Sequence, residues 1–209
     1  MLTETTNADR RYCRCSRSRP EIDRGLATVL RWWPTVGLLA TLALGWAVGR
    51  GSTPIDDWFS RATLTLVGGQ PRWLLIFTSG WLVLAVTLAC LVVALSRRQW
   101  ALAAAVLACP FAVTVATMAL KSLFDRRNGP YLEYPSGHTA LLVAVLGMMV
   151  VVAGSTLARG WALAGATLVC LLGMVGLVAC GYHFFTDTVG GAMLATALVC
   201  GTARLTSAL

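Results

Sequence analysis

The feature that most constrains this chain is a series of long apolar stretches that contain no charged residue. Of its 209 residues, 57% are hydrophobic and only 12% are charged, whereas a soluble domain usually carries about 25% charged residues. Most of the chain therefore cannot face water. The stretches are Trp32–Gly49, Trp73–Leu95, Gln99–Leu120, Thr139–Ala158, Gly160–Tyr182 and Thr188–Ala203.

The lengths of these stretches suit helices that cross a membrane. A helical span needs roughly 20 apolar residues, and every stretch but the last is long enough as it stands. The last reaches that length if its helix begins at His183. Lipid offers no hydrogen bonds to a bare backbone, so only helices or closed barrels cross it, and long uniformly apolar runs do not fit the alternating strands of a barrel. We predict an all-α polytopic membrane protein whose residues 26–209 form a bundle of six transmembrane helices.

The distribution of basic residues predicts the orientation of the chain. Residues 1–25 are polar and arginine-rich, which is typical of a disordered cytoplasmic tail. With the amino terminus inside and six spans, the inner segments hold eleven Lys and Arg residues and the outer segments hold six, in agreement with the positive-inside rule. We therefore expect a multi-pass protein of the inner (plasma) membrane with a cytoplasmic amino terminus. The net charge of +8 comes with no nucleic-acid motif, so we expect no nucleic-acid partner.

One outer loop, Gly51–Arg72, is longer than the others. Asp56, Asp57, Trp58 and Phe59 in this loop indicate the beginning of a short helix that lies in the membrane interface.

Three polar motifs stand where predicted spans end or begin. They run from Lys121 to Arg127, from Tyr134 to Thr139, and from His183 to Asp187. The fourth span leaves the membrane face that carries His138, and the fifth span returns to that same face before His183. All three motifs therefore meet at one face, which the charge distribution makes the outer face.

The second motif has the features of a phosphate-binding helix start. Pro135 cannot continue a preceding helix, Ser136 is a favoured N-cap residue, and Gly137 lets a ligand approach the backbone. The free N–H groups and the positive dipole end of the following helix suit an anion. Three cations of the first motif can add charge-assisted hydrogen bonds to that anion; they are Lys121, Arg126 and Arg127.

The two histidines of the chain supply groups for phosphoryl transfer. If a helix contains both His183 and Asp187, which are four residues apart, they share one face of it. A carboxylate in that position fixes the tautomer of an imidazole and stabilises its cation, which makes His183 a candidate nucleophile at phosphorus. His138 is then the candidate general acid for the leaving oxygen.

These motifs resemble those of the phosphatidic acid phosphatase type 2 superfamily of membrane lipid phosphatases. The resemblance covers roughly residues 75–205. Pro135-Ser136-Gly137-His138 matches the second motif of the family in full, while His183 and Asp187 match the end of the third motif and Lys121 the start of the first. Pro-Ser-Gly-His alone is a weak signal, but His-x-x-x-Asp two spans later makes the pattern specific.

The resemblance implies a six-span fold and a phosphohistidine intermediate on His183. Asp187 would hold that histidine, His138 would protonate the leaving group, and Lys121, Ser136 and Gly137 would cradle the phosphate. No metal or other cofactor is implied. The expected activity is hydrolysis of a lipid phosphate or diphosphate, such as a polyprenyl diphosphate, phosphatidate or phosphatidylglycerol phosphate, with membrane lipids as surroundings.

Two arginines of the family pattern are missing. Asn128 stands where the arginine of the first motif is expected, and Leu177 stands where that of the third is expected. Arg126 or Arg127 is the candidate substitute from a shifted loop. The losses leave open a non-catalytic lipid-phosphate-binding relative of the same fold.

Two weaker alternatives are a small transporter and a metal site. The uncharged second to fifth spans offer no polar pathway. A metal site would use His138, His183 and Asp187. The oligomeric state and the identity of the lipid stay open.

Overall fold

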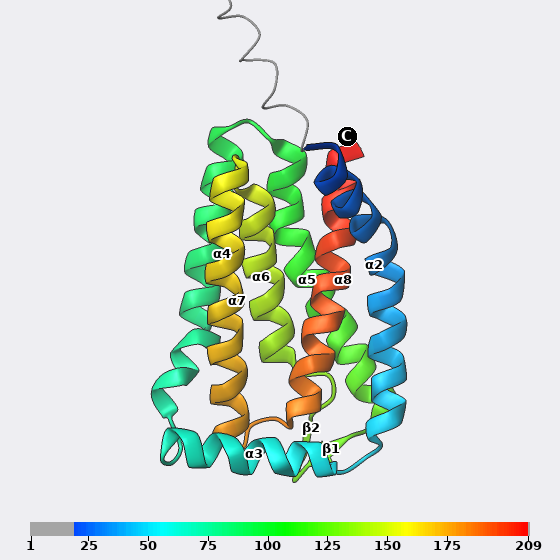
Figure 1. Cartoon of the computed structure of the whole chain (residues 1–209), viewed down its shortest axis with the longest axis vertical. Coiled ribbons are helices and arrows are strands. Elements are labelled where there is room, and N and C mark those ends of the chain that lie inside the picture. Colours follow the sequence, from blue (N-terminus) through cyan, green and yellow to red (C-terminus); the bar gives the residue numbers. More distant parts are fainter. Residues whose placement is uncertain (1–18, 209) are drawn as a thin grey trace, which may run out of the picture.

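The computed structural model describes residues 19–208, which are almost entirely helical. The elements are α2 (Arg19–Val48), α3 (Pro54–Val67), the 3-10 helix η1 (Arg72–Thr78), α4 (Gly80–Ser96), α5 (Trp100–Phe124), β1 (Arg127–Asn128), β2 (Tyr131–Leu132), α6 (Gly137–Val152), α7 (Thr156–Ala179) and α8 (Phe185–Ala208). Six helices run along the long axis of the molecule, and α3 lies across one end (Figure 1). The predicted all-α bundle is confirmed.

The helices have the length and composition of membrane spans. Four helical segments within residues 19–208 are long and apolar enough to cross a membrane, namely Arg72–Ser96, Trp100–Phe124, Thr156–Ala179 and Phe185–Thr206. Helix α6 is apolar but has only 16 residues, and α2, with 30 residues, is not among the four. The chain is a helical membrane protein, and the predicted number of six spans is approximate.

Three boundaries differ from those predicted. Helix α2 begins at Arg19, within the segment that we expected to be disordered, while residues 1–18 of that tail lie outside the described residues. The fourth span does not continue to Ala158, because Ser155 ends the turn after α6 and caps α7 by accepting a hydrogen bond from the Ala158 amide at 3.2 Å. Helix α8 begins at Phe185 rather than at His183.

The long loop Gly51–Arg72 contains the predicted short helix. Thr53 caps α3, and its hydroxyl and backbone N–H form a capping box with Asp56. Gly68, in the left-handed conformation at φ 72°, ends the helix. One side of α3 is buried against the bundle through Asp56 and Thr63. The outer side exposes Trp58, which suits the predicted position in the membrane interface.

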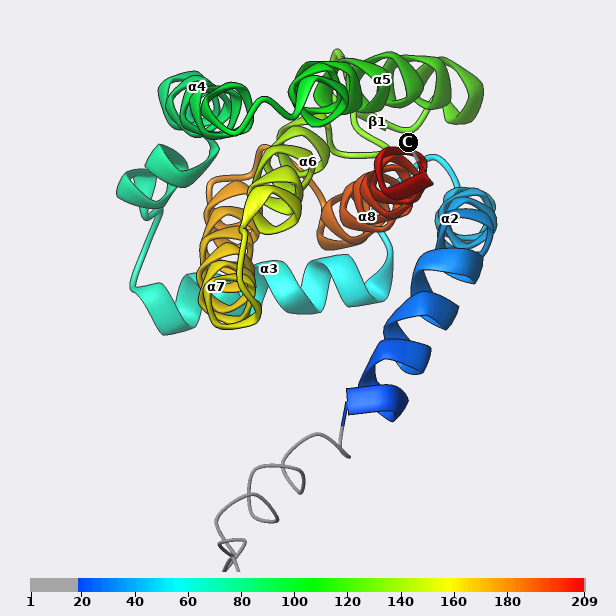
Figure 2. The ribbon, with the colours of Figure 1, turned by 90° about the horizontal axis from the view of Figure 1, so that it is seen from above.

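Helix α6 lies in the middle of the bundle, packed against α4, α5, α7 and α8 (Figure 2). Helices in lipid associate through close contact of small residues rather than through the hydrophobic effect. Gly190 and Gly191 of α8 provide such a contact, because a Cβ at Gly190 would lie 2.5 Å from the Tyr134 ring and one at Gly191 would lie 2.5 Å from the Ser136 carbonyl oxygen. These two glycines let α8 press directly against the segment that begins α6.

Replacing Gly191 with alanine tests this contact. The new Cβ would collide with the backbone at Ser136, so we expect a loss of about 1–3 kcal/mol of stability. Gly165→Ala is the matched control, because a Cβ at this α7 glycine would meet nothing within 4 Å. Thermal unfolding in detergent should show a lower Tm for Gly191→Ala and an unchanged or higher Tm for Gly165→Ala. Equal Tm values for the two variants would contradict the close contact.

Candidate active site

The structure brings the two histidines together at the end of the bundle that carries α3. His138 is the second residue of α6, and His183 lies in the loop between α7 and α8. Their rings lie edge to face, with His138 Nδ1 3.5 Å from His183 Nε2. His183 is buried, whereas His138 is exposed. A ligand that reaches His138 therefore also reaches Nε2 of His183.

The start of α6 faces the same point with its backbone. Ser136 is the N-cap, and its hydroxyl accepts from the Thr139 amide at 3.3 Å. The Ser136 amide in turn donates to the Asp187 carbonyl at 2.9 Å, which fixes the start of α6 to the start of α8. The first amides of an α-helix, here those of Gly137 and His138, have no acceptor within the helix. They and the helix dipole form a candidate anion site beside the two rings.

Lys121 supplies a positive charge close to this helix start. It lies in the last turn of α5, and its ammonium group donates to the Leu132 carbonyl. The charge of Lys121 interacts with both His138 and Glu133. A short hairpin follows, in which Arg127 pairs with Leu132 and Asn128 with Tyr131. Lys121 thus holds the hairpin while its charge remains beside the candidate anion site.

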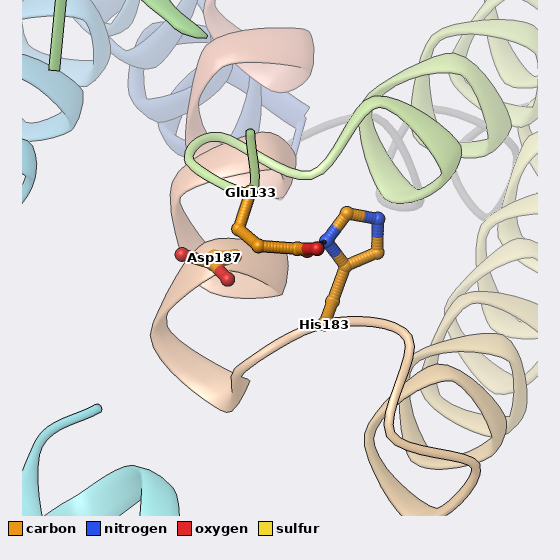
Figure 3. Close-up of side chains that lie close together, drawn as sticks. All are labelled: Glu133, His183 and Asp187. Atoms are coloured by element: carbon orange, nitrogen blue, oxygen red, sulfur yellow. Dashed lines mark ion pairs between the residues drawn. The ribbon is translucent and has the colours of Figure 1, made fainter. Parts of the chain in front are cut away.

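Glu133, directly after β2, contacts the nucleophile candidate. Its Oε2 forms an ion-pair contact with Nδ1 of His183, and both side chains are almost completely buried. Figure 3 shows the Glu133 carboxylate meeting the imidazole ring, with the Asp187 carboxylate to one side on α8. The ring nitrogen that faces away from His138 is therefore next to Glu133.

Asp187 does not bond to His183 in this structure. Helix α8 begins at Phe185, so His183 precedes the helix and does not share a helical face with Asp187. One oxygen of Asp187 accepts from the Phe184 amide at 3.0 Å. The other accepts from Arg126 Nη1 at 2.7 Å. Asp187 caps its own helix and neutralises an arginine.

Arg126 is completely buried and uses all five of its N–H groups. Its Nε and Nη2 donate to the Gly51 carbonyl at 3.1 and 2.8 Å, and Nη2 also donates to Asp56 at 2.7 Å. Its Nη1 donates to Thr186 and Asp187, both at 2.7 Å. The guanidinium group also lies over the Phe184 ring, 4.7 Å from its centroid. In this arrangement Arg126 has no free donor for a phosphate.

Asp56 anchors α3 to this arginine. Besides the ion pair with Arg126, it accepts hydrogen bonds from the Thr186 amide at 2.8 Å and from the Thr53 amide at 2.9 Å. Burial raises the pKa of this carboxyl, but the hydrogen bonds from Thr186, Thr53 and Arg126 outweigh burial and hold the pKa below its ordinary value. Asp56 is therefore charged at neutral pH, as the pairing with Arg126 requires.

Arg127 occupies a different environment. Its side chain is 58% exposed and pairs with Asp125 at 2.8 Å. Its amide donates to the Arg50 carbonyl at 3.3 Å. The structure thus places the two adjacent arginines differently, Arg126 inside the protein and Arg127 on its surface.

Comparisons with known proteins identify the family and support the fold. The model of the PAP2 superfamily matches residues 80–209. The chain belongs to the PAP2 superfamily. A solved structure of a transmembrane PAP2-type phosphatidylglycerolphosphate phosphatase from Bacillus subtilis matches with a TM-score of 0.64 at 18% identity, over 85% of this chain and 95% of that one. A search of curated proteins found no match.

The chain departs from the PAP2 pattern at Asn128 and Leu177, where uncharged residues stand in place of arginine. Leu177 is buried in α7. The Asn128 side chain donates to the Gly181 carbonyl at 3.3 Å, which links the hairpin to the loop that leads to His183. Neither position provides the positive charge that the PAP2 motifs place there.

Glu133 and Asp56 were not identified from the sequence as residues of the site. Glu133 stands two positions before the Pro-Ser-Gly-His motif, and Asp56 was interpreted only as part of an interfacial helix. A signal was present, because the chain has only nine acidic residues and Glu133 is one of three that follow Asp57. An acid this close to a PAP2 motif in so poorly charged a chain is a candidate site residue.

One group within residues 19–208 has the composition of a metal site. The ligand atoms of Glu133, His183 and Asp187 lie within 4.8 Å of one another. Both Asp187 oxygens already accept hydrogen bonds, however, and His138, which we included in the alternative metal site, is not in the group. Within the group, Glu133 and His183 form an ion-pair contact, and Asp187 has no hydrogen bond or ion pair to either of them.

Removing the buried arginine should destabilise the protein. In Arg126→Met, the Asp56 and Asp187 carboxylates stay buried without their counter-charge, which typically costs about 3–5 kcal/mol. Arg127→Met is the matched control, because an exposed pair contributes at most about 1 kcal/mol. The measurement is Tm in detergent, with unfolding monitored by tryptophan fluorescence. If the two substitutions lower Tm equally, the ion network around Arg126 does not stabilise the fold as described.

Proposed function

We propose that this protein is an integral membrane phosphatase that hydrolyses a lipid phosphate or diphosphate through a phosphohistidine on His183. The observation that carries the proposal is the facing pair of rings, with His138 Nδ1 3.5 Å from His183 Nε2 at the start of α6. Membership of the PAP2 superfamily supports this class of reaction. The phosphate would lie against the amides of Gly137 and His138, with Lys121 beside it.

The reaction has two steps. In the first, Nε2 of His183 attacks phosphorus and forms an N–P bond while the bond from phosphorus to the leaving oxygen breaks, and His138 donates a proton to that oxygen. In the second, His138 takes a proton from water, whose oxygen attacks phosphorus and breaks the N–P bond. Inorganic phosphate leaves, and both histidines return to their starting protonation. We expect no metal in either step.

The proposed orientation places this site on the outer side of the membrane. The basic residues that we assigned to the inner side lie at the other end of the bundle, where Arg97 donates to the Val152 carbonyl at 2.8 Å and Arg159 to the Ala153 carbonyl at 2.9 Å. These carbonyls are at the end of α6 opposite to His138. The positive-inside rule then makes the histidine end the outer face.

The candidate substrates form the panel of lipids for the phosphate-release assay. It contains phosphatidylglycerol phosphate, which is named for the Bacillus subtilis structure, together with phosphatidate and a polyprenyl diphosphate. A second candidate function is lipid-phosphate binding without turnover. Two observations favour it: Arg126 has no free N–H group, and Leu177 fills a position where PAP2 relatives carry an arginine.

Phosphate release by purified protein in detergent, with a chelator present, tests the main proposal. His183→Ala should lower kcat by at least about 10³-fold, because the nucleophile is lost. His138→Ala should lower it by about 10²–10⁴-fold for a monoester. The loss should be smaller for a diphosphate, whose leaving group is a weaker base than an alkoxide. Labelled phosphate should be trapped on wild type and not on His183→Ala.

Three other outcomes have distinct meanings. Full activity in His183→Ala would disprove the phosphohistidine mechanism. Loss of wild-type activity in chelator would disprove its independence of metal. Tight binding of a lipid phosphate by wild type, with no turnover of any panel member, would establish the binding function instead.

A further inference from the structure

We propose that Glu133, and not Asp187, is the carboxylate that orients His183. This inference rests on the proposed phosphatase function and assigns a positioning residue to it. The PAP2 pattern would assign the orientation of His183 to Asp187, whereas we assign it to Glu133, which lies outside the motifs. It follows from the contacts of three side chains, which come from the hairpin, the α7–α8 loop and α8.

Within residues 19–208, the contacting atoms of Glu133 and His183 have only each other as polar partners. Glu133 Oε2 forms an ion-pair contact with His183 Nδ1, and neither atom has a hydrogen bond to any other described residue. Both are buried away from water, so each would lack a polar partner without the other, at a cost of about 1–3 kcal/mol. This environment favours the tautomer that carries its proton on Nδ1, facing Glu133. Nε2 then keeps its lone pair, pointing toward His138 and the phosphate site.

Asp187 makes its hydrogen bonds to other groups. Its two oxygens accept from Arg126 Nη1 and from the Phe184 amide, at 2.7 and 3.0 Å. Turning the carboxylate toward His183 would weaken its bond to the buried guanidinium or to the amide that begins α8. Asp187 therefore lies near His183 without bonding to it, and it fixes the start of α8 just after that histidine.

The backbone of Glu133 is held firmly on both sides. Its amide donates to the Arg126 carbonyl at 2.8 Å. The preceding residue, Leu132, accepts from Lys121, and the following residue, Tyr134, donates its hydroxyl proton to the Thr41 carbonyl at 2.5 Å. A carboxylate on such a fixed backbone can hold an imidazole within the narrow range of orientations that catalysis needs. An exposed loop glutamate could not do so.

Glu133 would act in the same two steps. As Nε2 bonds to phosphorus, positive charge develops on the imidazole, and the adjacent carboxylate stabilises it while Nδ1 keeps its proton. When water displaces the phosphate, that charge disappears and the neutral ring returns to the same tautomer. No proton needs to pass to Glu133, and no oxidant, reductant or metal takes part. Glu133 is therefore a positioning residue that acts through His183.

The experiment compares three nearly isosteric substitutions in the purified full chain. Glu133→Gln removes the proposed orienting charge, Asp187→Asn removes the charge at the motif position, and Asp125→Asn removes an exposed charge 41% accessible to solvent before the same hairpin. Phosphate release is measured for each, with kcat and KM separated. Because the chain has only two histidines, ¹⁵N-histidine NMR of the same samples reports the His183 tautomer directly.

We expect Glu133→Gln to lower kcat by about 10²–10⁴-fold, as for other carboxylates that orient a catalytic histidine, with KM changed little. Its NMR spectrum should lose the single Nδ1–H tautomer of His183. Asp125→Asn should match wild type. Asp187→Asn should lower Tm the most, because it breaks the pair with Arg126, yet keep the His183 tautomer and a higher kcat per folded protein than Glu133→Gln.

Several results would overturn the inference. One is a kcat within threefold of wild type for Glu133→Gln, especially if Asp187→Asn alone loses the tautomer. Another is a bound metal ion whose removal abolishes activity, because Glu133 and His183 would then be its ligands. If wild type releases no phosphate, the proposed function fails separately. The NMR comparison still decides whether Glu133 or Asp187 holds the ring.

Discussion

The arrangement of the site depends on one buried guanidinium group. Arg126 joins the loop before α3 through Gly51, α3 itself through Asp56, and the first turn of α8 through Thr186 and Asp187. Its backbone carbonyl also accepts from the Glu133 amide. A buried cation is stable only when it is paired and hydrogen-bonded, and here every N–H group has an acceptor. Arg126 thereby fixes both acids that flank His183. Its guanidinium group binds the Asp187 carboxylate, and its backbone carbonyl accepts from the Glu133 amide.

This use of Arg126 changes the electrostatics of anion binding. The buried cluster contains the carboxylates of Asp56, Glu133 and Asp187 against the cations of Lys121 and Arg126, so the acids outnumber the permanent cations. A phosphate that approaches His138 meets amides, a helix dipole and Lys121, while the guanidinium is already neutralised. In the proposed mechanism the general-acid proton on His138 adds positive charge, because His183 must be neutral to attack phosphorus. Binding and turnover by that mechanism would therefore depend more on the protonation of His138 than they would in a site with free arginines.

The sequence was sufficient for the fold and for the meeting of the motifs, because both follow from long-range regularities. Uncharged stretches of span length determine the bundle, and counting spans places His138 and His183 at one end. The sequence was insufficient where a side chain could choose between partners. The four-residue spacing of His183 and Asp187 suggested a shared helical face, but Asp187 caps α8 and leaves His183 outside it. Likewise, nothing in two adjacent arginines indicates that one is buried and the other exposed.

The same competition explains why a loop glutamate lies next to His183, the proposed nucleophile. An acid at the third position of a helix readily accepts from the N-cap amide, and Arg126 donates to the other oxygen of Asp187. These two bonds hold the Asp187 carboxylate away from hydrogen-bonding distance of His183. The imidazole, buried at the end of α7, still requires an acceptor for Nδ1. The hairpin supplies it, because the Arg126 carbonyl, Lys121 and Tyr134 hold the backbone around Glu133 in place. In the proposed mechanism, orientation of the histidine is thus a property of the loop between α5 and α6, which also carries the candidate phosphate-binding helix start, so one segment would position both reacting partners.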